Sequence, residues 1–88
     1  MRVESPAFME FVATLGCRMR MHDPCSSGPS SEAHRTGASD LTAIPLCRKH
    51  RLALVTNQAP FSTMGAEGRL RWELAQVSYV RRRWMAVS

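Results

Sequence analysis

The tetrapeptide Cys-Arg-Lys-His at residues 47–50 constrains this chain more than any other sequence feature. Its cysteine and histidine are about one helical turn apart, so both side chains can reach one zinc ion. Pro45 limits the apolar run at residues 41–46 to an edge strand or an extended segment. The sequence therefore predicts an extended segment that leads into a helix at Cys47, with half of a metal site in the first helical turn.

The other half of the site has two candidate ligand sets upstream, and the residues alone leave both open. Cys17 and Cys25 would complete a set of three thiolates and one imidazole. His22 and Cys25 would instead repeat the spacing of Cys47 and His50, with two residues between the ligands, and such a short loop closes tightly. Cys25, Cys47 and His50 belong to both sets, so we expect a structural zinc ion in either case.

A chain of 88 residues is one domain at most, which we take as residues 1–88. A core of this size is marginal, and a structural zinc ion contributes about 10–16 kcal/mol to folding at neutral pH. The three cysteines are an odd number, so they cannot form a complete disulfide framework. No secretory signal and no apolar run of about 20 residues is visible in the sequence. We therefore expect a cytoplasmic protein with no membrane partner, where clustered cysteines bind metal more often than they pair.

Two helices are predicted, one on each side of the candidate metal site. In residues 5–16, Ser5 is a suitable N-cap and Gly16 a suitable stop, and the apolar stripe comprises Phe8, Phe11, Val12 and Leu15. Residues 66–86 form a longer basic helix whose apolar face is predicted to carry Leu70, Leu74 and Val77, extended by Trp72, Ala75 and Tyr79. The fold class is therefore small α+β.

The charge of the chain suits a polyanionic partner. The formal net charge is +5, and eleven of the twelve basic residues are arginines. Arginine presents a rigid fork of donors that matches phosphate, so the composition favours nucleic acid. Two other causes would also account for the arginines. A genome rich in G and C inflates arginine content. The helix dipole also favours cations near a helix C-terminus, where Arg81, Arg82 and Arg83 lie.

His34 stands apart from both halves of the metal site, thirteen residues before Cys47. A single histidine in polar surroundings is more often a surface residue than a catalytic one. We expect His34 to lie in the first strand of a hairpin whose second strand runs into the helix at Cys47. This arrangement would bring His34 beside the first turn of that helix. His34 is therefore the candidate catalytic residue.

In their order these residues resemble the HNH, or ββα-metal, nuclease family, especially its small phage and prophage members. The shared segments are Leu15-Gly16-Cys17, Pro24-Cys25, Ser31-Glu32-Ala33-His34 and the run from Asp40 to His50 that contains Ile-Pro-Leu-Cys-x-x-His. The resemblance covers roughly residues 5–57, with the HNH-like motif at about 17–57. It implies a zinc-stabilised ββα-metal domain with an N-terminal and a C-terminal helix.

The resemblance also implies roles for particular residues. It selects Cys17, Cys25, Cys47 and His50 as ligands of a structural zinc ion. His34 would be the general base of a metal-dependent DNA endonuclease, with a divalent Mg²⁺ or Mn²⁺ ion that stabilises the leaving oxygen. The basic candidates for contact with DNA are Arg35, Arg48, Lys49 and Arg51.

Arg51 stands where active members of the family carry a second histidine that binds the catalytic ion. The glycine-containing loop at residues 36–39 is also shorter than is usual in the family. Without that histidine, a catalytic ion would have to rely on Glu32, His34 or Asp40. The alternative prediction is therefore a zinc-stabilised, HNH-like protein that binds DNA without cutting it. A third hypothesis is a zinc-stabilised module that binds a protein through residues 81–84.

Overall fold

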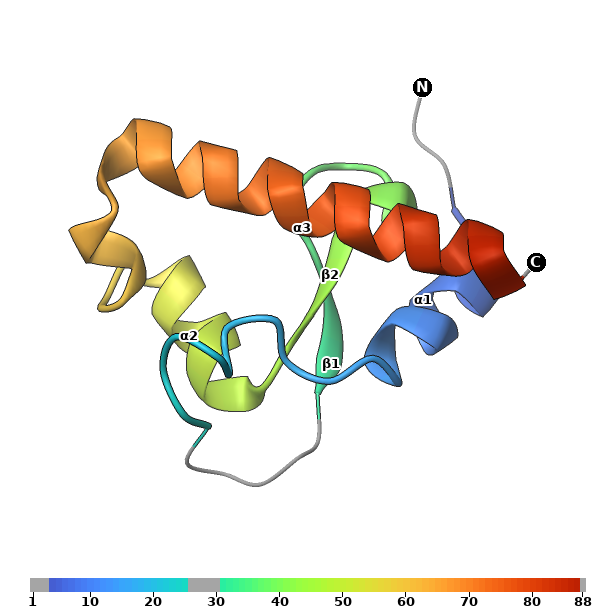
Figure 1. Ribbon diagram of the computed structural model, residues 1–88, viewed down its shortest axis with the longest axis horizontal. Coiled ribbons are helices and arrows are strands. Elements are labelled where there is room, and N and C mark those ends of the chain that lie inside the picture. The colour runs from blue at the N-terminus through green and yellow to red at the C-terminus, as the bar shows by residue number, and fades with distance from the viewer. Residues whose placement is uncertain (1–3, 26–30, 88) are drawn as a thin grey trace.

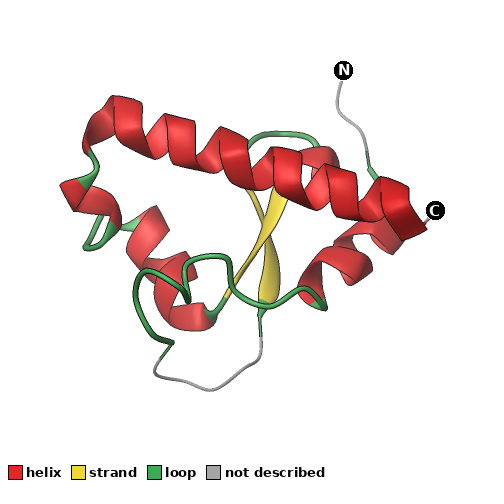
Figure 2. Ribbon diagram, in the orientation of Figure 1, coloured by secondary structure: helices red, strands yellow, loops and turns green. Residues whose placement is uncertain are grey.

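Two antiparallel strands form the centre of the fold, and helices pack around them (Figures 1 and 2). The computed structural model describes residues 4–25 and 31–87. Within these residues the helices and strands are α1 (Pro6–Ala13), β1 (Glu32–Arg35), β2 (Ala43–Leu46), α2 (Arg48–Val55) and α3 (Gly65–Val87). Short 3-10 turns at Asp40–Thr42 and Phe61–Thr63 precede β2 and α3. The predicted α+β class is confirmed.

Helix α1 begins where the sequence predicts. The Ser5 side chain accepts a hydrogen bond from the backbone N–H of Phe8, and Pro6 occupies the first turn, where no N–H is needed. The helix ends at Ala13, three residues earlier than expected, because the backbone tightens through Thr14 before the chain reverses. Gly16 makes that reversal with a φ of 79°, which a residue without a Cβ adopts freely.

The strands pair in a register that places His34 opposite Ile44 and Ala33 opposite Pro45. Every residue of β2 is buried, whereas β1 is exposed at both of its ends. The carbonyl of Pro45 accepts a hydrogen bond of 3.0 Å from the backbone N–H of Arg18, so the loop that follows α1 runs beside β2. A two-stranded sheet is marginal in water, and the helices supply the packing that it needs.

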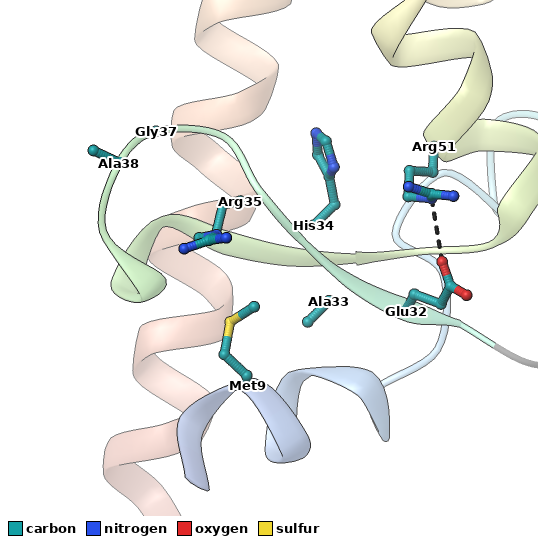
Figure 3. Close-up of a pocket in the computed structure, with 8 residues that line it drawn as sticks. All are labelled: Met9, Glu32, Ala33, His34, Arg35, Gly37, Ala38 and Arg51. Atoms are coloured by element: carbon teal, nitrogen blue, oxygen red, sulfur yellow. Dashed lines mark ion pairs between the residues drawn. The ribbon is translucent and has the colours of Figure 1, made fainter. Parts of the chain in front are cut away.

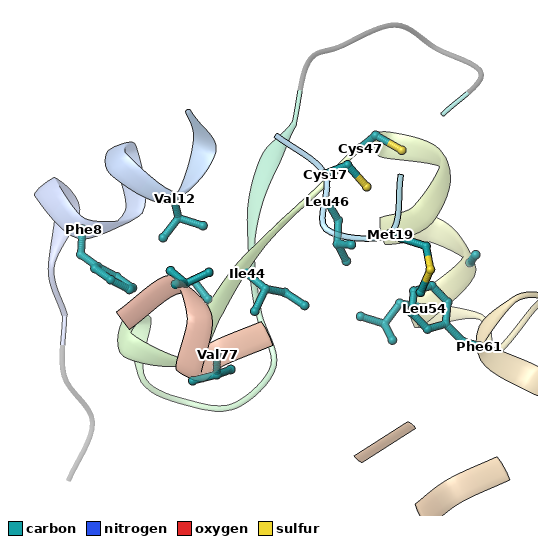
Figure 4. Packing of buried hydrophobic residues seen from close by; sticks show 13 residues of the cluster. Phe8, Val12, Cys17, Met19, Ile44, Leu46, Cys47, Leu54, Phe61 and Val77 are labelled. Atoms are coloured by element: carbon teal, nitrogen blue, oxygen red, sulfur yellow. The ribbon is translucent and has the colours of Figure 1, made fainter. Parts of the chain in front are cut away.

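One buried cluster joins all the layers (Figure 4). Phe8 of α1 and Ile44 of β2 are fully buried, as are Phe61, which follows α2, and Val80 of α3. Burying one such side chain contributes about 1.5–3 kcal/mol. Trp84 of α3 stacks edge-on against Phe8, with ring centroids 5.5 Å apart, so the first and last helices close the fold together.

The apolar face of α3 differs from the prediction. Leu70 and Leu74 are 56% and 62% exposed, whereas Val77 and Val80 are buried. The face is rotated because Trp84 packs against α1 and Trp72 packs edge-on against Phe61, with ring centroids 5.2 Å apart. Helix α3 is also the longest of the described helices, yet none of them has the length and apolar character that crossing a membrane requires.

Candidate metal centre and basic pocket

Four side chains that are distant in the sequence meet at the start of α2. The Sγ atoms of Cys17, Cys25 and Cys47 and a ring nitrogen of His50 all lie within 4.8 Å of one another. His50 Nδ1 is 3.3 Å from the sulfur of Cys17, 3.7 Å from that of Cys25 and 3.1 Å from that of Cys47. A tetrahedral zinc ion holds sulfur and nitrogen ligands about 3.5 Å apart. The four residues could therefore bind a metal ion such as zinc.

Each ligand position follows from local structure. Cys47 is the N-cap of α2, and its sulfur accepts a hydrogen bond of 3.5 Å from the backbone N–H of His50. Cys17 directly follows the reversal at Gly16, in the loop that runs beside β2. The group contains Cys17 and not His22, which is exposed. The spacing argument for His22 fails because Cys17 is fixed near β2 by its neighbour Arg18.

Asp23 is a member of this centre that the sequence reasoning missed. Its Oδ2 atom is 2.8 Å from Nε2 of His50 and 3.1 Å from Nζ of Lys49. A carboxylate on Nε2 fixes the histidine tautomer that leaves Nδ1 free to act as a ligand. The hydrogen bond from His50, and then that from Lys49, lowers the pKa of Asp23. The position of Asp23 two residues before Cys25 was the only signal available in the sequence.

The electrostatics of the thiols fit a metal-binding group. Burial raises the pKa of Cys25 to about 12, with further increases from Cys47 and Cys17. Burial also acts to raise the pKa of Cys47, but the hydrogen bonds from the His50 backbone N–H, from the thiols of Cys25 and Cys17 and from the Lys49 backbone N–H together outweigh it, so the pKa of Cys47 is lowered. Three thiols this close cannot all ionise without a cation between them, because their like charges repel. A bound metal ion supplies that charge.

His34 lies in a different place, in a pocket of about 510 Å³ along β1. Figure 3 shows the His34 ring and the Arg51 side chain on the same side of the strand. Burial lowers the pKa of His34, and the positive charge of Arg51 lowers it further. Arg69 acts in the same direction, while Glu73 opposes it. The ring of His34 makes no hydrogen bond within residues 4–25 and 31–87, so it is available to a ligand.

The acidic side chains near His34 are already engaged. Glu32 Oε2 forms an ion pair of 3.2 Å with Arg51 Nε, although its angle does not meet hydrogen-bond geometry (Figure 3). Asp40 accepts a hydrogen bond of 2.7 Å from the backbone N–H of Ser5 and lies 3.3 Å from Arg35 Nη1. Within the part of the chain that the structure describes, one group of three or more His, Cys, Asp or Glu side chains has its ligand atoms close enough to hold a metal ion. That group is Cys17, Cys25, Cys47 and His50.

The basic candidates divide between the two regions. Arg35 and Arg51 line the pocket of His34. Arg48 and Lys49 are exposed on the first turn of α2, and Lys49 bonds to Asp23 and to the carbonyl of Pro24. At the far end of α3, Arg81 donates a hydrogen bond of 2.9 Å to the carbonyl of Leu41. Of the four candidates, only Arg35 and Arg51 therefore lie beside His34.

Comparisons with known proteins add no relative: no protein-family model matches the chain, and no curated protein or solved structure matches it either.

Proposed function

We propose that this chain is a zinc-stabilised, HNH-like domain that binds DNA. The observation that carries the proposal is the order of elements around the metal centre. An antiparallel hairpin, β1 and β2, leads directly into α2, and α2 supplies His50 to a group of three cysteines. That order and the motif from Asp40 to His50 are the features of the ββα-metal resemblance.

Zinc has a structural role in this proposal. Cys17, Cys47 and His50 are buried, Cys47 is also the N-cap of α2, and Asp23 holds His50 from outside the ligand set. A structural zinc site is closed by four protein ligands, whereas a catalytic one keeps a position for water or substrate. The four-ligand set of Cys17, Cys25, Cys47 and His50 therefore supports the fold. DNA would bind elsewhere, on the surface of the hairpin and helices.

Charge supports DNA as the partner. The net charge of +5 is carried almost entirely by arginine, and Arg35, Arg48 and Arg51 lie on or beside the ββα unit. Such side chains gain affinity by releasing counterions from the DNA backbone, and this gain depends strongly on salt. The proposal therefore concerns backbone contacts and makes no claim of base recognition.

Fluorescence anisotropy with a labelled DNA duplex, across a series of salt concentrations, tests this proposal. The binding constant of the zinc-loaded protein should fall as salt rises, along a straight line of log binding constant against log salt concentration. The slope of this line should become shallower by about one unit for each phosphate-contacting arginine removed. Arg48→Gln is the test variant. Arg71→Gln is the matched control, because Arg71 is exposed on α3 and pairs with Glu67 at 3.9 Å. Binding that does not change with salt would rule the proposal out, and equal losses in both variants would rule out a specific DNA contact by Arg48.

A second candidate is the metal-dependent HNH endonuclease, and the state of His34 favours it. Its lowered pKa keeps the ring neutral at physiological pH, which a general base requires. The side chain also lines a pocket large enough for a nucleotide. A Mg²⁺ or Mn²⁺ ion bound there would stabilise the leaving oxygen of the phosphodiester.

Plasmid nicking distinguishes the two candidates. Zinc-loaded wild-type protein is incubated with supercoiled plasmid and Mn²⁺ or Mg²⁺, and His34→Ala is the matched variant. Endonuclease activity predicts nicking that His34→Ala abolishes. No nicking by the wild type, or equal nicking by both proteins, leaves DNA binding as the function.

A further inference from the structure

We infer that the pocket along β1, which Arg51 of α2 also lines, is an anion site for a single phosphate group, held by Arg51 with His34, and that Glu32 is its internal competitor. The inference rests on the proposed DNA-binding function, because it names the group of the partner that this surface takes. It also assigns the pocket a ligand of opposite charge to the cation that active HNH enzymes bind there.

Arg51 is the first reason for an anion site. Its side chain extends from α2 over β1 and is 42% exposed, so part of the guanidinium is open to solvent (Figure 3). Its Nε atom is covered but has no hydrogen-bond partner within the described residues. A guanidinium with unused donors is suited to phosphate, which accepts two parallel hydrogen bonds from it.

The field around His34 is the second reason. Arg51 and Arg69 both act on the ring as positive charges, and the negative charge of Glu73 opposes them. Asp40 is turned away toward Ser5 and Arg35. A hard divalent cation prefers several oxygen ligands. An oxygen-rich ligand set is lacking here among the described residues, whereas an anion meets the Arg51 guanidinium and the donor of a neutral imidazole.

Glu32 occupies the place that a phosphate would take. Its carboxylate lies 3.2 Å from Arg51 Nε, yet the side chain is 62% exposed. An ion pair this exposed contributes little, and salt screens it further. A phosphate oxygen can therefore replace the carboxylate without breaking buried packing. The pocket volume of about 510 Å³ also leaves space for the atoms on either side of a backbone phosphate.

The experiment is a titration of the zinc-loaded protein with inorganic phosphate at constant ionic strength, followed by NMR of the His34 ring. The wild type should give a saturable shift of the His34 signals. Glu32→Gln should tighten phosphate binding about two- to fivefold, because that is the effect of removing an exposed competing ion pair. Arg51→Gln should abolish saturation, whereas Arg71→Gln should leave the titration unchanged. The zinc content of each variant shows that the fold is intact.

Three results would overturn the inference. One is the absence of a saturable shift in the wild type, and another is equal weakening by Arg51→Gln and Arg71→Gln. The third is weaker phosphate binding in Glu32→Gln together with Mn²⁺ broadening of the His34 signals in the wild type, which would make Glu32 a metal ligand. Anisotropy with duplex DNA separates this inference from the proposed function. DNA binding without a phosphate effect at His34 refutes only the anion site, and phosphate binding without DNA binding refutes only the DNA partner.

Discussion

His50 and Arg51 are consecutive residues of α2 that belong to regions of opposite chemistry. His50 is fully buried and directs Nδ1 at three sulfurs, with Asp23 behind its other nitrogen. Arg51 is half exposed and extends over β1 toward Glu32 and His34. Successive helix positions are rotated by about 100°, so one helix can serve both regions. The candidate metal centre brings together four ligand side chains and a supporting carboxylate, whereas the pocket presents the guanidinium of Arg51.

The largest expected effect comes from opening the metal centre. Cys47→Ser removes a ligand and the N-cap sulfur of α2 together, and the zinc contribution of about 10–16 kcal/mol is as large as the whole stability of a typical small domain. We therefore expect Cys47→Ser to lose both bound zinc and helical circular dichroism at 25 °C. His22→Ala is the control and should keep one zinc per chain by metal analysis. A folded, zinc-free Cys47→Ser protein would show that the core alone is sufficient.

The next effect tests the support of the metal centre. Asp23→Asn keeps the size of the side chain but removes the charge that orients His50. We expect it to weaken zinc binding about 10- to 100-fold, as the loss of such a supporting group usually does. Competition with a chromogenic chelator measures the change. Unchanged affinity would mean that Cys47 and the α2 backbone hold His50 in place by themselves.

A smaller effect is expected from converting the pocket. Arg51→His removes a positive charge and adds a neutral imidazole ligand beside His34. We expect Mn²⁺ binding in the pocket to tighten about tenfold, equivalent to about 1.4 kcal/mol. Paramagnetic broadening of the His34 signals reports it, with Arg48→His, at the first residue of α2, as the control. Equal Mn²⁺ broadening in the wild type would show that the pocket already binds a divalent cation, so the two regions would not differ in this respect.

The smallest effect is on the titration of His34. Its pKa is lowered by burial first and by Arg51 second, so the ring should titrate below its ordinary value of 6.5. Arg51→Gln should raise the pKa only part of the way, because burial remains. Since the folded protein binds this proton less readily than the unfolded chain, stability from this group is present above pH 6.5 and is lost as the pH falls. An NMR titration that Arg51→Gln does not shift would contradict the charge argument.

The local features of the fold could be predicted from sequence because they depend on neighbouring residues. Ser5 and Pro6 mark the start of α1, and Pro45 with Cys47 marks the passage from β2 into α2. The exposed side of α3 could not be predicted in this way. Leu70 and Leu74 fit a helical stripe, but the face that packs is selected by Trp84 against Phe8, a contact between the two ends of the chain.

The residues of the candidate site also divide into those that the sequence could predict and those that depend on contacts between distant residues. Cys25, Cys47 and His50 could be grouped from residue type and spacing, because few ligand types suit zinc. Spacing could not choose Cys17 over His22, since that choice depends on how the loop after α1 runs beside β2. Asp23 was missed because its role depends on which nitrogen of His50 faces the sulfurs, and no spacing rule encodes that. The Glu32–Arg51 pair was also invisible, since it joins a strand to a helix across nineteen residues of sequence.

A metal ion held by the four residues would also constrain the topology of the chain, because it would join Cys17 and Cys47, which are thirty positions apart. Closing a segment of that length costs about 3 kcal/mol of chain entropy plus a constant. Lengthening the segment twofold would add only about 0.6 kcal/mol, because this cost grows with the logarithm of length. A cross-link between these two cysteines would therefore tolerate a longer segment between its two halves at a small cost in chain entropy.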